Sequence, residues 1–81
     1  MSYEVVWKPL ALKFLKSLPP LIATRIHEKI GMVSEDPFRY VGKFQGPFHK
    51  LRIGSYRALV MITPEKNLLE IELLDKRENI Y

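Results

Sequence analysis

The sequence predicts an α+β fold in which an N-terminal helical hairpin packs on one face of an antiparallel sheet. Two observations predict it: apolar residues recur at helical spacing over residues 9–33, and they alternate with polar residues from residue 48 onward. Strands joined by short turns pair antiparallel, and the apolar faces of the helices and the sheet bury each other in two layers. We expect residues 1–81 to form a single domain.

The first half of the chain predicts one strand and two helices. Residues 2–7, SYEVVW, are rich in strand-forming residues. Pro9 suits the first turn of a helix, which Pro19 and Pro20 end before Pro20 opens the next one. So short a break predicts an antiparallel helical hairpin. The apolar stripe of the second helix comprises Ile22, Ile26, Ile30 and Val33.

The second half predicts three strands, or four. Residues 43–46, KFQG, predict a short edge strand or a loop, and residues 48–53 and 56–63 predict strands. After the turn PEKN, residues 68–75 predict a half-buried strand whose two faces alternate: Leu69, Ile71 and Leu73 on one side, and Glu70, Glu72 and Leu74 on the other. The predicted order is therefore β-α-α-β-β-β(β).

Gly54-Ser55 predicts a two-residue hairpin turn with a positive φ at the glycine. Counting outward from this turn sets Arg52 directly opposite Arg57, although like charges in that position repel and weaken a sheet. We assign Leu51 and Ile53 to the core, so Lys50, Arg52 and Arg57 share the open face. Three cations on an uncovered face indicate a site for an anion.

The charge distribution agrees with such a site. The formal net charge is +4, but no Asp or Glu occurs between Pro37 and Pro64. A patch of one sign is typical of a surface that binds a polyanion, and a solvated basic face is the alternative from charge alone. The cationic residues of this interval are Arg39, Lys43, Lys50, Arg52 and Arg57, with His49 among them.

The chain lacks the residues that several classes of catalytic and binding site require. The chain has no cysteine, no histidine–carboxylate cluster with metal-ligand spacing and no glycine-rich phosphate loop, so we expect no metal and no cofactor. His27 falls beside the helical stripe, on the surface or rim, and His49 falls on the core face with a partly buried structural role. No apolar run approaches the roughly 20 residues of a membrane span, and we expect a cytoplasmic protein with no membrane partner.

A site rich in arginine and lysine can still cleave RNA, because the 2′-hydroxyl is a nucleophile that the substrate itself carries. The site must remove its proton, stabilise the charge on the phosphoryl oxygens and assist departure of the 5′-oxygen. Arginine suits the second task because its planar fork matches phosphate.

The segment KLRIGSYRALVMI, followed by a hairpin and LDKRENIY, resembles the RelE/ParE superfamily of toxins from toxin–antitoxin systems, and RelE-like mRNA interferases in particular. The resemblance rests on the LR-G-YR core with the C-terminal R…Y and spans essentially the whole chain. It implies a type II toxin that inhibits translation as a metal-independent endoribonuclease, cutting mRNA in the ribosomal A site by 2′-hydroxyl attack. The implied partners are a cognate RelB-like antitoxin, the ribosome and mRNA, with operator DNA only through the antitoxin complex.

The resemblance also implies roles for individual residues. Lys50 would handle the 2′-hydroxyl proton or stabilise charge, Arg57 would stabilise the transition state, and Arg77 would act at the leaving group. The best-studied members carry a lysine where this chain has Phe48, which leaves the general base open. Tyr81 would stack on a base, and the phosphate-binding residues would be Arg52, Lys43 and Lys76.

Two alternatives stay open. A ParE-like toxin shares the fold and inhibits DNA gyrase without cutting RNA. A family member that binds RNA but has lost its activity would also carry these residues, and Phe48 together with the acidic Glu70 and Glu72 keeps that alternative open.

Overall fold

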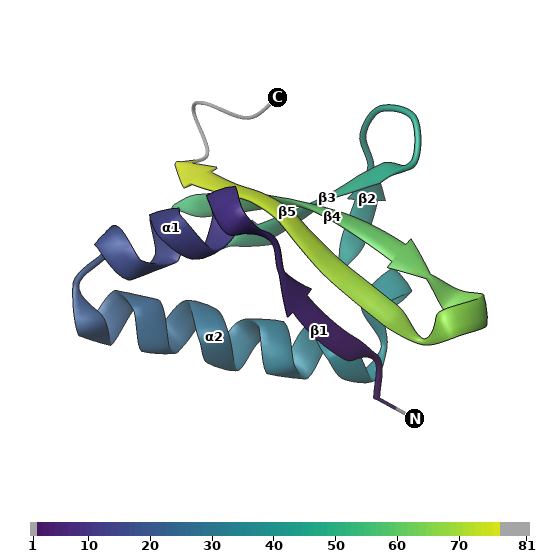
Figure 1. The fold of residues 1–81 in the computed structure, drawn as a ribbon, viewed down its shortest axis with the longest axis horizontal. Helices are drawn as coiled ribbons and strands as arrows, with labels where there is room; N and C mark the ends of the chain where they lie inside the picture. The colour runs from purple at the N-terminus through teal and green to yellow at the C-terminus, as the bar shows by residue number, and fades with distance from the viewer. Residues whose placement is uncertain (1, 77–81) are drawn as a thin grey trace.

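The computed structural model describes residues 2–76, which form two helices and five strands (Figure 1). The helices are α1 (Pro9–Ser17) and α2 (Pro20–Glu35). Short 3₁₀ turns, η1 (Pro37–Arg39) and η2 (Pro64–Lys66), follow α2 and β4. The strands are β1 (Glu4–Trp7), β2 (Val41–Lys43), β3 (Phe48–Ile53), β4 (Tyr56–Thr63) and β5 (Leu68–Lys76).

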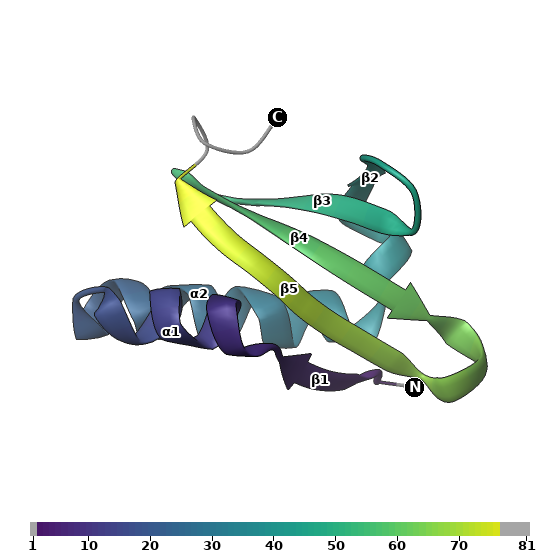
Figure 2. The same cartoon turned by 45° about the horizontal axis from the view of Figure 1, so that its top comes forward.

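The five strands form one sheet in the order β1-β5-β4-β3-β2 (Figure 2). The last four strands pair antiparallel, as predicted, but β1 runs parallel to β5, so the sheet is mixed. Two backbone hydrogen bonds hold the ends of β1 against β5: the Glu4 N–H donates to the Asn67 carbonyl at 2.7 Å, and the Lys8 N–H donates to the Ile71 carbonyl at 3.0 Å.

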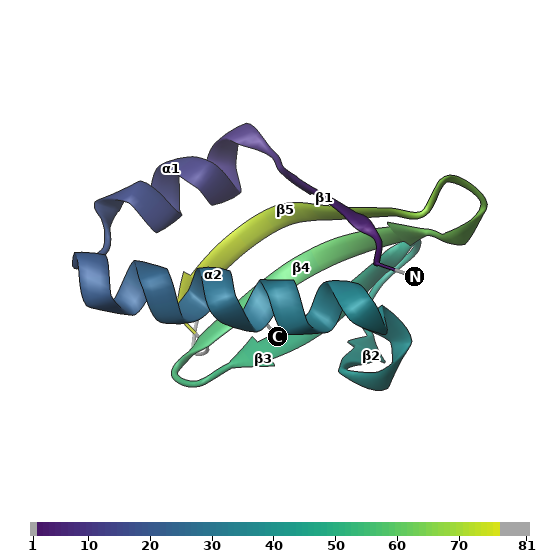
Figure 3. The ribbon, with the colours of Figure 1, turned by 90° about the horizontal axis from the view of Figure 1, so that it is seen from below.

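Both helices lie on the same face of the sheet (Figure 3). Pro9 occupies the first turn of α1, and Pro20 occupies the first turn of α2, as the sequence predicts. The helices diverge from their connection, with α1 beside β5 and α2 beneath the middle of the sheet. Within residues 2–76 no helix covers the opposite face, and neither helix is long and apolar enough to cross a membrane.

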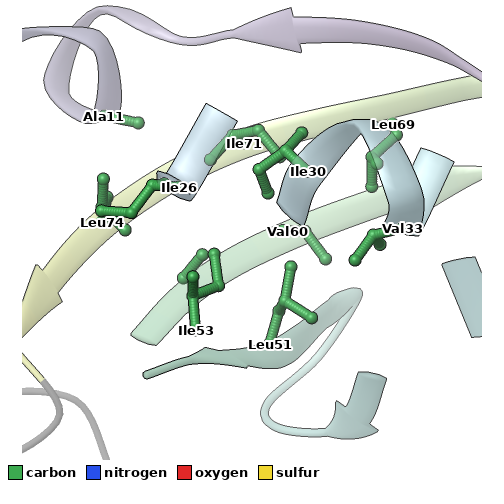
Figure 4. Packing of buried hydrophobic residues seen from close by; sticks show 11 residues of the cluster. Ala11, Ile26, Ile30, Val33, Leu51, Ile53, Val60, Leu69, Ile71 and Leu74 are labelled. Atoms are coloured by element: carbon green, nitrogen blue, oxygen red, sulfur yellow. The ribbon is translucent and has the colours of Figure 1, made fainter. Parts of the chain in front are cut away.

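The core lies between α2 and the sheet (Figure 4). Ile26, Ile30 and Val33 of α2 are at most 2% exposed and face apolar side chains of the three central strands. The assignment of Leu51 and Ile53 to the core face is confirmed. The fully buried strand residues are Leu51, Ala58, Val60, Leu69, Ile71 and Leu74.

A β-bulge in β5 corrects one predicted face. Leu59 pairs with Leu73 and Val60 pairs with Ile71, which leaves Glu72 as an extra residue on β5. An extra residue shifts the alternation of side chains by one position. Leu74, and not Leu73, therefore shares the buried face with Leu69 and Ile71, so the face predicted for these two leucines is wrong.

The β3–β4 hairpin has the predicted register, with Ile53 opposite Tyr56 and Arg52 opposite Arg57. Gly54 has a φ of +58°, as the two-residue turn requires. Of the two alternatives for residues 43–46, the loop is confirmed for residues 44–46. The edge strand begins two residues earlier than expected, since residues 41–43 pair with β3 and residues 44–47 form the turn. The Phe44 N–H donates to the Phe48 carbonyl at 3.2 Å and closes this turn.

Replacing Gly54 with alanine should lower the free energy of unfolding by about 1–2 kcal/mol, because an L-residue is strained at this positive φ. The matched control is Gly31→Ala in α2, where a Cβ meets nothing within 4 Å. That variant should raise the same free energy by about 0.5–1 kcal/mol. Urea unfolding followed by circular dichroism measures both, and equal effects would contradict the assignment of strain to Gly54.

Candidate anion site on the open sheet face

Three cationic side chains meet on the open face. Arg52 lies directly opposite Arg57, and Lys50 precedes Arg52 by two residues on the same strand face. All three line one hollow of about 210 Å³, together with Tyr40 and Gly42. The predicted convergence of these cations is therefore present, and a phosphate or another anion can contact several of them at once.

Tyr40 and Gly42 were not identified from the sequence, because the edge strand was expected two residues later. Gly42 is the middle residue of β2 and lies opposite Lys50. Tyr40 immediately precedes β2, and the Lys29 Nζ of α2 lies 4.9 Å from the centroid of its ring. A glycine inside a strand is a signal for close approach of a ligand, but it can be used only once the strand has been located.

An acid flanks the three cations. Asp75 of β5 lies opposite Arg57, on the side away from Arg52. The bulge at Glu72 determines this placement, because it moves Asp75 onto the open face and Leu74 into the core. The Asp75 Oδ1 also accepts a hydrogen bond from the Lys76 N–H at 2.7 Å. Arg57 therefore lies between a like charge and an opposite charge.

The other predicted phosphate contacts do not join this cluster. Lys43 lies opposite His49, and strand alternation places both on the helix side of the sheet. Lys76 is exposed and lies opposite Tyr56, whose ring packs against Phe14 of α1 at a centroid distance of 6.1 Å. The predicted catalytic residues Arg77 and Tyr81 lie outside the described residues.

Both histidine predictions are confirmed in their placement. His27 is exposed on α2, and His49 is half-buried on the helix side of β3. The His49 ring meets the Phe38 ring edge-on at 5.8 Å. Its Nδ1 is buried and has no hydrogen-bond partner among residues 2–76. His49 is thus a packing residue on the face opposite the three cations.

Neutralising Arg52 should stabilise the fold, because it removes the like charge opposite Arg57. We expect Arg52→Gln to raise the free energy of unfolding by roughly 0.2–1 kcal/mol, with a smaller gain at high salt. Urea unfolding at two salt concentrations measures the effect. Lys66→Gln is the control, since Lys66 is an exposed cation in η2. A loss of stability in Arg52→Gln would contradict repulsion between the two arginines.

The described residues have the fold of RelE toxins. A search of solved structures returns RelE toxins and RelBE toxin–antitoxin complexes over nearly the whole chain, and the resemblance predicted from the sequence is confirmed. Comparisons with protein-family models and with curated proteins give no match.

Three of these structures show the extent of the similarity. The toxin–antitoxin complex RelBE2 from Mycobacterium tuberculosis has 28% identity and a TM-score of 0.86, covering 95% of this chain and 100% of that chain. The RelE–RelB complex from Pyrococcus horikoshii has 25% identity and a TM-score of 0.81, with coverage of 95% and 97%. The isolated E. coli RelE toxin has 19% identity and a TM-score of 0.77, with coverage of 93% and 84%, and it shares the fold.

Proposed function

We propose that this protein is the toxin of a type II toxin–antitoxin system and cleaves mRNA on the ribosome. The observation that carries the proposal is the convergence of Lys50, Arg52 and Arg57 around one hollow on the uncovered face of the sheet. The similarity to RelE toxins supports the same assignment.

The proposed reaction needs no nucleophile from the protein. The 2′-oxygen attacks the adjacent phosphorus and loses its proton, and the bond from phosphorus to the 5′-oxygen breaks. The departing 5′-oxygen takes up a proton, which gives a cyclic phosphate and a free 5′-hydroxyl. In this proposal Arg57 stabilises the charge on the phosphoryl oxygens, and Arg52 binds the backbone phosphate. Lys50 acts at the 2′-hydroxyl or stabilises charge.

The described residues that line the hollow include neither a histidine nor a carboxylate. Asp75 lies nearby, opposite Arg57, and its position suits orientation of the Arg57 guanidinium. Arg77 at the leaving group, Tyr81 as a stacking residue, and Lys43 and Lys76 as outer phosphate contacts complete the proposed set. Lys43 would contact RNA only around the edge of the sheet, since it shares a face with His49.

The proposed partner that restrains this activity is a cognate RelB-like antitoxin. Two of the three structures described above are complexes of such toxins with their antitoxins, from Mycobacterium tuberculosis and Pyrococcus horikoshii. We propose that operator DNA is contacted only through the antitoxin complex. Action on translating ribosomes places the protein in the cytoplasm.

Incubating the purified protein with mRNA on a programmed ribosome tests the proposal, with the same mRNA free of ribosomes as the control. We expect cuts on the ribosome and none in free mRNA. Absence of cleavage on the ribosome would overturn the nuclease assignment. Salt-dependent RNA binding without cleavage would then favour an inactive RNA-binding member, and inhibition of DNA gyrase would favour a ParE-like toxin.

A further inference from the structure

We propose that the hollow is a subsite for one nucleotide of single-stranded RNA, with the base against the Tyr40 ring and the phosphate on the three cations. Tyr40 and Gly42 are then specificity-determining residues of the site. This inference rests on the proposed function for its substrate class. It adds the two residues that β2 and its preceding turn bring to the hollow.

Tyr40 is held in place from two directions. Its ring is half-buried against the hydrophobic core, and the Lys29 Nζ lies 4.9 Å from the ring centroid. Its backbone N–H donates to the Pro37 carbonyl at 3.1 Å, which fixes the end of η1. A ring already held by its surroundings loses little freedom when a ligand binds. An aromatic ring beside phosphate-binding cations is the combination that recognises unpaired nucleotides.

Gly42 keeps the space between Tyr40 and Lys50 open. The glycines with a positive φ are Gly46 and Gly54, and Gly42 is not among them. The backbone therefore does not require a glycine at position 42. A Cβ at Gly42 would lie 3.8 Å from the Lys50 Cε, which is an ordinary contact. A glycine in the middle of a short strand weakens that strand. A larger residue is compatible with the backbone at position 42, but its side chain would occupy the hollow. The glycine therefore keeps the hollow accessible to a ligand.

The size of the hollow limits the ligand. Its volume of about 210 Å³ lies below the roughly 300–1,000 Å³ of pockets that enclose drug-sized molecules. The hollow can therefore enclose no more than one nucleotide unit, and the rest of an RNA strand would continue over the open sheet. The cations lie on β3 and β4, whereas Tyr40 lies next to the edge strand. The base therefore points toward the β2 edge and the phosphate toward the middle of the sheet.

Binding of a trinucleotide with 2′-O-methyl groups tests this arrangement, because it cannot be cleaved and needs no ribosome. Its dissociation constant is measured by NMR titration for the full chain and its variants. We expect Tyr40→Leu and Gly42→Leu to weaken binding on the order of tenfold, by loss of stacking and by filling the hollow. Tyr40→Phe should bind the trinucleotide as tightly as the wild-type protein does, because it keeps the aromatic ring. Gly42→Ala should weaken binding less than Gly42→Leu does.

The salt dependence separates stacking from charge. Tyr40→Leu should keep the slope of log Kd against log salt, because it removes no phosphate contact, whereas Arg52→Gln should reduce that slope. Tyr3→Leu is the matched control, since Tyr3 also packs against the core but does not line the hollow. Thermal unfolding of each variant checks the fold. If Tyr40→Leu does not fold, two other measurements decide the outcome. They are the binding of the trinucleotide by Gly42→Leu and the shift of the Tyr40 ring signals when the trinucleotide is added to the wild-type protein.

The result separates this inference from the proposed function. Wild-type binding of the trinucleotide that is weakened by Gly42→Leu and Tyr40→Leu supports the subsite even if no mRNA is cut on the ribosome. Equal binding by the wild-type protein, Tyr40→Leu and Gly42→Leu overturns the subsite even if the ribosome assay shows cleavage. Absence of binding by the wild-type protein also overturns it.

Discussion

Replacing Arg57 with alanine is expected to slow mRNA cleavage on the ribosome by a factor on the order of 10²–10³, the usual cost of removing one group that stabilises developing charge. Arg57 lies on the central strand β4 between Arg52 and Asp75 and lines the cationic hollow. Its planar fork can contact two phosphoryl oxygens at once, which a lysine side chain cannot do in the same way. Single-turnover cleavage at saturating protein measures the loss.

Two further variants make this test specific. Arg25→Ala removes an exposed arginine from α2, on the helix-covered side, and should leave the cleavage rate unchanged. Arg57→Lys keeps the charge but loses the fork, so its rate should lie between those of the wild-type protein and Arg57→Ala. Cleavage by Arg57→Ala at the wild-type rate would remove this residue from the proposed chemistry.

Replacing Ile71 with alanine is expected to lower the free energy of unfolding by about 2–5 kcal/mol. Ile71 is fully buried on β5, close to Ile30 of α2 (Figure 4). A domain of 81 residues has a total stability of about 4–12 kcal/mol, so this single cavity removes a large part of it. Tm should fall on the order of 15 °C, as measured by circular dichroism.

The size of the cavity should set the size of this effect. Ile71→Val removes one methyl group and should cost about 0.5–1.5 kcal/mol. Met32→Ala, at an α2 position that is 56% exposed, should cost far less. If Met32→Ala destabilised the protein as much as Ile71→Ala, the location of the core between α2 and the sheet would be wrong.

The hairpin at the centre of the site was predictable because its information is local. Gly54-Ser55 fixes the turn, the turn fixes the pairing, and alternation fixes the face of each side chain. The two helices were equally predictable from the sequence, since prolines mark where both begin. The resemblance to RelE toxins followed from the LR-G-YR segment in that hairpin together with the C-terminal R…Y.

The remaining part of the site depends on contacts between distant segments. The bulge at Glu72, which sets Asp75 opposite Arg57, has no turn residue to mark it, because glutamate fits a regular strand equally well. Tyr40 joins the hollow only through the pairing of β2 with β3. The same pairing directs Lys43 to the other face. The placements of Tyr40 and Lys43 both depend on an edge strand of three residues, which is too short to show a periodic pattern.

The position of β5 determines when the protein can fold during synthesis. β5 comes last among the described strands, yet it lies between β1 and β4 and supplies Leu69, Ile71 and Leu74 to the core. The strand β1, which begins at Glu4, therefore cannot pair with β5 until Leu68 and the residues after it have been synthesised. Contacts between residues so far apart in sequence slow folding. A nascent chain stopped before β5 lacks three of the apolar side chains that pack against α2 and lacks Asp75 beside Arg57, so the finished site forms only after this strand has been translated.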